Sequence, residues 1–100
     1  PEVKKGVLEG HVAYVDHFGN IITNITPDDI KLLQEVTKKK DFSLQLGSLT
    51  IKEFKTHYEQ GSTEIPSALI NSNGYIELFL QQERISDKLG VRIDDLVYVS

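Results

Sequence analysis

The 100-residue chain has no cysteine, no tryptophan and only three prolines. The absence of cysteine excludes a disulfide framework and a thiolate metal site, and it is compatible with a reducing compartment, so we expect a cytoplasmic protein. No apolar run approaches the ~18 residues that a membrane span needs, and no signal-peptide pattern is present, so we expect no membrane partner. Because the chain opens at Pro1 without an initiator methionine, we expect it to be part of a longer polypeptide.

An excess of positive charge is also missing. The 11 basic residues are outnumbered by 15 acidic residues, which gives a formal net charge of −4. A non-specific nucleic-acid surface needs the opposite balance, so we expect no nucleic-acid partner. The only basic run is Lys38 to Lys40, and lysines at a helix end usually just complement the helix dipole.

Common catalytic motifs are absent as well. The sequence has no phosphate-binding loop, no dinucleotide fingerprint, no zinc-protease motif and no serine-hydrolase elbow. Its three histidines, His11, His17 and His57, are scattered over a strand face, a turn and a loop edge. We therefore expect no metal site.

What the sequence contains fits one small domain over residues 1–100, with 39% hydrophobic residues and room for a single core. Alternation of apolar and polar residues predicts about seven short strands, at 7–15, 21–25, 42–46, 49–51, 67–70, 75–80 and 93–99. The segment 55–58 is expected to continue the strand at 49–51 as an edge strand.

One helix has clear signals. Thr26 is expected as its N-cap and Pro27 as its first residue, with two aspartates in the first turn and the lysines from Lys38 closing it. A second, short helix is expected within 81–89, with a cap at Ser86 and an end at Gly90. The pattern predicts a mainly β fold, a small antiparallel barrel or sandwich with one or two short helices.

The stretch from Asp16 to Ile25 has strand-like apolar residues on both sides, but its middle contains poor strand formers, among them Gly19 and Asn20. A sequence that gives up local stability in this way is a first place to look for function. Two interpretations remain open. Asp16 and the nearby amides form an Asx-turn, or they form a polar cluster that holds a small polar ligand.

A second polar turn, Asn71 to Gly74, is by itself typical of a hairpin. Tyr58, an aromatic in a polar loop, is either a lid on the core or a stacking platform. Two Asn/Gly turns and an isolated aromatic can form one rim at an end of a barrel, where ligand-binding loops tend to cluster.

Residues 10–25, GHVAYVDHFGNIITNI, resemble a GxVxxxDxFGNxxTNI pattern, and residues 71–78, NSNGYIEL, resemble an NSxGYLEI pattern. Both patterns occur in this order in the C-terminal domain of the S-adenosylmethionine (SAM) hydroxide adenosyltransferases, which are relatives of the fluorinating and chlorinating enzymes that act on SAM. The end of the chain, Asp94 to Val99, fits the family's GDxVxV ending, so the resemblance covers nearly the whole chain.

The resemblance implies the C-terminal domain of a two-domain SAM hydrolase, whose N-terminal α/β domain is absent here. It implies a homotrimer, with each active site between one subunit's N-terminal domain and a neighbour's C-terminal domain. Hydroxide from water, or a halide in the halogenating branch, displaces methionine from the 5′ carbon of SAM, which is the substrate, and no cofactor is implied. Because the family's water-activating residues lie in the N-terminal domain, we expect no catalytic residue here and an inactive isolated chain.

The resemblance also implies roles for six residues. Asp16 matches an acid near the methionine amino group, and Phe18 and Asn20 match positions of the adenosine pocket, with the asparagine at the adenine edge. Tyr58 falls near an aromatic that stacks on adenine. The pair near the methionine carboxylate corresponds to Ser72 and Asn73. The fluorinating enzymes have arginine in place of Asn73, which argues against a close relation to them.

The chain departs from the family pattern after residue 80. Where the family usually has an Asn-Arg-Gly-Ser-Ala-like turn whose backbone meets adenine, residues 81–86 read QQERIS and contain no glycine. This departure favours an alternative, a non-catalytic ligand-binding or assembly module with the same fold. A third interpretation, an oligonucleotide-binding barrel, conflicts with the charge of −4.

Overall fold

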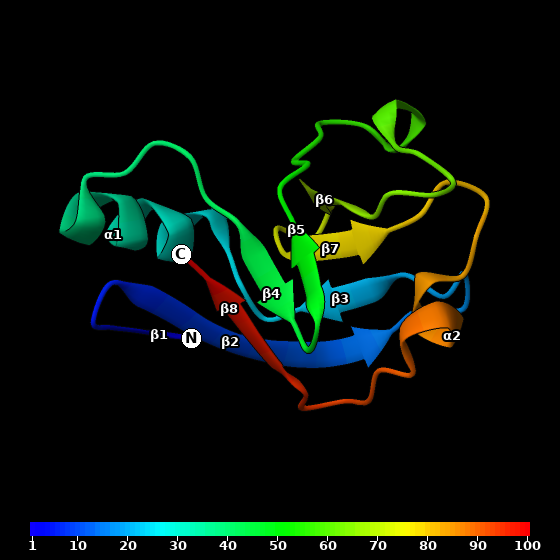
Figure 1. Ribbon diagram of the computed structural model, residues 1–100, viewed down its shortest axis with the longest axis horizontal. Coiled ribbons are helices and arrows are strands. Elements are labelled where there is room, and N and C mark those ends of the chain that lie inside the picture. The colour runs from blue at the N-terminus through cyan, green and yellow to red at the C-terminus, as the bar shows by residue number, and fades with distance from the viewer.

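The computed structural model describes residues 1–100 as one curled antiparallel sheet with a helix at each end of its long axis (Figure 1). The strands are β1 (Glu2–Lys4), β2 (Val7–Val15), β3 (Ile21–Thr23), β4 (Leu44–Leu46), β5 (Leu49–Ile51), β6 (Ser67–Ile70), β7 (Ile76–Phe79) and β8 (Leu96–Val99). The helices are α1 (Pro27–Thr37), α2 (Ile85–Leu89) and the 3₁₀ turn η1 (Tyr58–Gln60). The expected mainly β fold is confirmed. Neither α1 nor α2 is long and apolar enough to cross a bilayer.

The sheet nearly closes into a barrel. Its strands follow the order β5-β4-β8-β2-β3-β7-β6, and β1 pairs with β2 outside this path. The residues after β5 lie beside β6, where Phe54 forms a parallel bridge to Ala68. Ala68 N–H donates to the Glu53 carbonyl at 2.8 Å, and Lys55 N–H donates to the Ala68 carbonyl at 2.7 Å. This short parallel contact joins the two edges of an otherwise antiparallel sheet.

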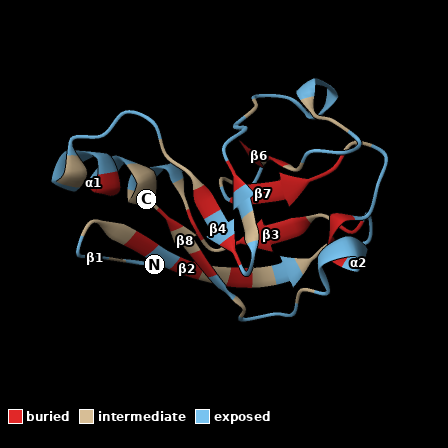
Figure 2. Ribbon diagram, viewed as in Figure 1, coloured by how far each residue is buried: buried red, intermediate tan, exposed pale blue.

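The buried residues are concentrated in the strands, and β3 and β7 are buried along their whole length (Figure 2). β2 shows the alternation expected of a strand with one buried face, since Leu8, Gly10 and Val12 are buried between more exposed neighbours. All four residues of β7 are buried, including the acid Glu77. The main cluster comprises Leu8, Val12, Ile21, Ile25, Leu33, Leu44, Leu46, Ile51, Ala68, Ile76, Leu78, Leu80, Ile85, Val97 and Val99.

Helix α1 begins as its sequence predicts. Thr26 Oγ1 accepts from Asp29 N–H at 3.3 Å, and the Asp29 carboxylate accepts from Thr26 N–H at 2.9 Å, which completes a capping box. The helix ends at Thr37, and Lys38 takes the left-handed conformation with φ 62°. The lysines therefore follow the helix, and its last turn holds no basic residue.

Several predicted elements are shorter than the apolar pattern suggests. β3 stops at Thr23 because the Asn24 side chain, in place of a backbone carbonyl, accepts from His11 N–H at 2.8 Å. β8 starts only at Leu96, after Asp94 in a left-handed conformation with φ 74°. β4 starts at Leu44, two residues later than expected.

Three further differences concern element identity. The expected edge strand at 55–58 is wrong, because beyond the single bridge at Phe54 the chain turns into η1. Ser86 does not cap α2, which has Arg84 at its N-cap and ends, as expected, before a left-handed Gly90. β1 was not expected. It pairs with the start of β2 in a hairpin, around Lys5 and Gly6, whose φ values are both positive.

Candidate functional site

The turn from Asp16 to Asn20 follows β2 directly and is organised by one carboxylate oxygen. Asp16 Oδ1 accepts from the backbone N–H groups of Phe18 at 2.9 Å and Asn20 at 3.0 Å. Two backbone bonds close the same turn, from Asp16 N–H to the Asn20 carbonyl and from Gly19 N–H to the Asp16 carbonyl. The Asx-turn interpretation therefore accounts for Oδ1, while Oδ2 has no bond within the protein and stays available.

Gly19 attaches this turn to the segment that begins α2. Its φ is +83°, and a Cβ at this position would lie 2.6 Å from Arg84 Cβ and 2.9 Å from Arg84 Cα. Its carbonyl accepts from Ser86 N–H at 3.0 Å, and Arg84 Nη1 donates to the His17 carbonyl at 2.6 Å. Only glycine permits both the backbone conformation and this close approach.

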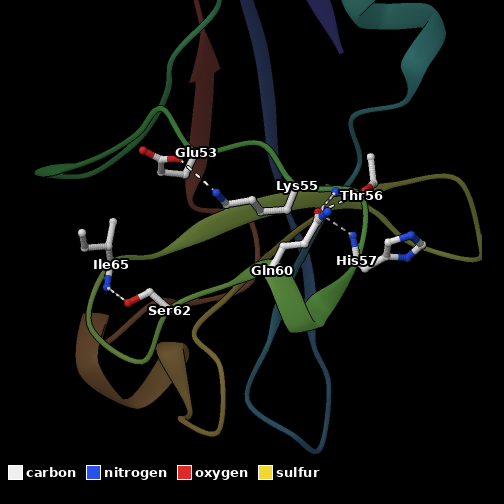
Figure 3. A network of polar contacts seen from close by, with 7 residues as sticks. All are labelled: Glu53, Lys55, Thr56, His57, Gln60, Ser62 and Ile65. Atoms are coloured by element: carbon white, nitrogen blue, oxygen red, sulfur yellow. Dashed lines mark hydrogen bonds and ion pairs between the residues drawn. The ribbon is translucent and has the colours of Figure 1, made fainter.

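The loop that carries Tyr58 is held by a single glutamine side chain (Figure 3). Gln60 Oε1 accepts from Thr56 N–H at 2.8 Å, Thr56 Oγ1 at 3.0 Å and His57 N–H at 3.2 Å. Further along, Ser62 Oγ accepts from Ile65 N–H at 3.2 Å. These bonds satisfy backbone groups that an edge strand would otherwise pair, so the loop has a defined conformation around Tyr58.

Beneath the turn and the loop lies a buried acid that our reasoning from sequence missed. Glu77, in the middle of β7, is 3% exposed. Its Oε2 accepts from Tyr58 Oη at 2.5 Å and from Asn20 Nδ2 at 3.2 Å, and its Oε1 accepts from Asn71 Nδ2 at 3.2 Å. The available signal was an acid inside the apolar run from Ile76 to Phe79, because a carboxylate there needs partners.

These segments enclose an open pocket of about 950 Å³ at one end of the barrel. Its wall combines aromatic rings, amides and charges of both signs. It is lined by Asp16, His17, Phe18, Asn20, Tyr58, Phe79, Leu80, Gln81, Gln82, Glu83, Arg84, Asp87 and Lys88. A volume of this size suits a ligand of nucleoside dimensions or larger.

The structure thus brings together four of the six predicted binding residues, namely Asp16, Phe18, Asn20 and Tyr58. Ser72 and Asn73 are exposed in the turn between β6 and β7 and do not line this pocket. The preceding residue, Asn71, nevertheless shares the Glu77 carboxylate with Asn20 and Tyr58. The binding roles of all six residues remain predictions.

The segment without the family's glycine still makes a turn with a left-handed residue. Gln82 has φ 60°, and Leu80 and Glu83 form a bridge around it. The preceding residue, Gln81, donates its N–H to the Ser62 carbonyl at 2.8 Å. A glutamine therefore adopts the backbone conformation that glycine takes most easily, and its side chain is added to the pocket wall.

The surroundings of the Tyr58 hydroxyl raise its pKa. Although 45% of the residue is exposed, the hydroxyl points inward to Glu77, while the ring packs edge-on against Phe79 with centroids 5.2 Å apart. Two main causes raise the pKa of Tyr58 well above its ordinary value. Burial of the hydroxyl is the larger cause, and the hydrogen bond to the Glu77 carboxylate is the second.

We expect Tyr58 to stay protonated in the folded chain at the pH, near 10, at which a free tyrosine ionises. As the pH rises, the unfolded chain loses the Tyr58 proton before the folded chain does. The contribution of this hydroxyl to the free energy of unfolding is therefore complete below about pH 10 and declines as the pH rises further. Absorbance at the phenolate band during an alkaline titration measures this, and Tyr58→Phe should remove the late-titrating group. If the difference between the wild-type and Tyr58→Phe titrations showed Tyr58 ionising near pH 10 in the folded protein, the buried bond would be contradicted.

No cluster of three or more His, Asp or Glu side chains has the arrangement of a metal site. His11 lies apart from the pocket, where its Nδ1 faces Asn24 Nδ2 at 3.2 Å. His17 lines the pocket rim and contacts the Phe18 ring, with centroids 4.0 Å apart. His57 lies in the Gln60-braced loop.

Solved structures of similar fold belong to much longer chains. One is a crystal structure of an uncharacterized conserved protein from Thermotoga maritima, with a TM-score of 0.73 and 22% identity. Another is a crystal structure of a conserved hypothetical protein from Thermus thermophilus, with a TM-score of 0.70 and 20% identity. They are covered over 37% and 34% of their lengths, while 97% and 92% of this chain is matched. At this identity the likeness establishes the fold alone.

No curated protein matches the chain by sequence. The sequence profile of the SAM hydroxide adenosyltransferase C-terminal domain, however, matches residues 10–98. That range includes the turn at Asp16, the loop of Tyr58 and the buried Glu77, so the match spans every wall of the pocket. The chain therefore belongs to the SAM hydroxide adenosyltransferase C-terminal domain family.

Proposed function

We propose that this chain is the substrate-binding C-terminal domain of a SAM hydrolase, an enzyme that converts SAM and water to adenosine and methionine. The observation that carries the proposal is the convergence of family-motif residues on one pocket. Asn20 and Tyr58 meet at a single oxygen of Glu77, and Asp16 lies in the same wall.

The chemistry of the pocket suits the parts of SAM. The exposed ring of Tyr58 offers a flat surface for a base, and Phe18, 65% exposed, adds a second aromatic at the rim. The free oxygen of Asp16 can accept from an ammonium group. The net negative charge of the chain also favours the approach of a cationic substrate. These residues bind and orient the ligand, which is the contribution to catalysis that positioning makes.

In this proposal, closure of the pocket and activation of water are contributed by the rest of the full-length protein. The chain spans just over a third of the length of its structural neighbours, and its pocket is open on one side. We propose an N-terminal α/β domain, from the same or a neighbouring subunit of a homotrimer, as the partner that closes it. It would supply the groups that activate water.

One observation favours a second candidate, a non-catalytic module that binds a small ligand or serves assembly. The side chains of Gln82 and Glu83 stand in the pocket wall where the family usually has a glycine-containing turn. A side chain at that position narrows the space in which a base can approach the backbone.

The isolated chain is expected to form no adenosine from SAM above the uncatalysed background, because one wall of the active site is missing. The full-length protein is expected to release adenosine and methionine in equal amounts, which chromatography of the products measures. Adenosine formation by the isolated chain would contradict the division of roles. SAM binding by the full-length protein without any turnover would identify the non-catalytic module instead.

A further inference from the structure

Glu77 is the one charged side chain of this chain that is buried in the barrel. It lies between Ile76 and Leu78 in β7, where a side chain without partners would be costly. Three donors satisfy it, the hydroxyl of Tyr58 and the amides of Asn20 and Asn71. A carboxylate accepts hydrogen bonds and donates none, so it dictates which atom each neighbour turns toward it.

This requirement fixes the orientation of the Asn20 amide. The two ends of an amide have nearly the same shape, and only the partners decide which end faces which way. Because Nδ2 must face Glu77, Oδ1 faces elsewhere. Every fully buried side-chain oxygen or nitrogen has a partner, and Asn20 Oδ1 has none, so this oxygen is accessible from solvent on a residue that lines the pocket.

The same carboxylate orients Tyr58. The hydroxyl is held inward at 2.5 Å from Glu77 Oε2, and the edge-on contact with Phe79 fixes the ring. The pocket is therefore offered the aromatic surface and not the hydroxyl. Asn20 Nδ2 and Tyr58 Oη bind one and the same oxygen, so an acceptor and an aromatic surface are held side by side.

We propose that Glu77 is a positioning residue that makes the pocket selective for a flat heteroaromatic ring bearing an exocyclic amino group. The amino group would donate to Asn20 Oδ1 while the ring packs on Tyr58. A ring with a carbonyl at the same place would set two acceptors against each other and leave both unpaired. The inference rests on the proposed function, since adenine is the base of SAM and hypoxanthine is its carbonyl counterpart.

The test compares adenosine, purine riboside and inosine as ligands of the full-length protein, by calorimetry. Adenosine is expected to bind about tenfold or more tightly than inosine, with purine riboside, which has no group at that position, between them. Equal binding of adenosine and inosine would overturn the role of Glu77 and leave the proposed function standing. If no nucleoside and no SAM binds, the proposed function fails and the inference fails with it.

The variant Glu77→Gln then tests the positioning itself. Glutamine keeps the shape but offers a donor as well as an acceptor, so Asn20 can turn its Nδ2 toward the pocket. We expect the preference for adenosine over inosine to fall to about threefold or less. A uniform loss of affinity for both nucleosides, with the ratio unchanged, would show that Glu77 serves only the fold.

Asn71→Ser is the matched control. It removes the donor to Glu77 Oε1 but leaves the two bonds to Oε2 that orient Asn20 and Tyr58. The nucleoside ratio should stay at the wild-type value, even if the melting temperature falls. A collapse of the ratio in this variant would mean that general loosening of the barrel, and not the orientation of Asn20, controls selectivity.

Discussion

Replacement of Asp16 by alanine in the full-length protein is expected to weaken SAM binding by roughly tenfold to a hundredfold. A carboxylate bonded to a substrate ammonium is a charge-assisted contact worth about 1.5–3 kcal/mol. The structure adds a second effect, because Asp16 Oδ1 also accepts from two backbone N–H groups of its turn. We therefore expect the alanine variant to lose about 1 kcal/mol of stability as well.

Asp16→Asn separates the two effects. Asparagine keeps an oxygen for the backbone bonds of the turn but carries no charge, so the melting temperature should change little while SAM affinity still falls. Asp41→Asn, which removes one negative charge from an exposed loop position outside the pocket, controls for long-range electrostatics. Calorimetric titration and a melting curve on each variant give the answer. Unchanged affinity in both Asp16 variants would assign this residue to the turn alone.

Gly19→Ala is expected to destabilise the 100-residue chain by roughly 2–4 kcal/mol. About 1–2 kcal/mol comes from forcing an alanine into a left-handed conformation, and the rest comes from overlap with the neighbouring chain. The overlap is with Cβ and Cα of Arg84, and these atoms cannot move away without straining the bond between Ser86 N–H and the Gly19 carbonyl. Urea unfolding monitored by circular dichroism measures the loss.

Gly74→Ala is the matched control for this variant. Gly74 has φ +86°, nearly the value at Gly19, but a Cβ there would have no atom within 4 Å. It should therefore show only the conformational cost, about 1–2 kcal/mol. If both variants lose the same stability, the contact between Gly19 and Arg84 is not tight, and the attachment of the turn to α2 is weaker than the geometry indicates.

The parts of the fold that the sequence predicted are those with local causes. The start of α1 depends on Thr26, Pro27 and Asp29, which lie within four positions of one another. The hairpin of β4 and β5 depends on a two-residue turn, and the end of α2 on Gly90. Neighbours in sequence are neighbours in space for such features, so their chemistry can be judged from the chain alone.

The outcome at 55–58 shows where local reasoning stops. The apolar and polar pattern there is compatible with a strand, but a strand also needs a partner, and β6 accepts only one bridging residue, Phe54. Gln60 instead satisfies the backbone of Thr56 and His57. Which of the two occurs depends on the curvature of the whole barrel, which the segment itself does not encode.

The sequence alone identified the polar turn after β2 as part of a candidate site and identified the family of the chain, because both signals are contiguous motifs. The tertiary structure decided which side chains share a pocket. Glu77 is 57 positions from Asn20 and 19 from Tyr58 in the sequence. Only the curling of the sheet brings Asn20 Nδ2 and Tyr58 Oη to the same oxygen, Glu77 Oε2. The same folding left Ser72 and Asn73 outside the pocket lining. The donors of a buried carboxylate come from segments that meet only in the folded chain. The orientation of the Asn20 amide is therefore set by the fold and not by the sequence motif that contains Asn20.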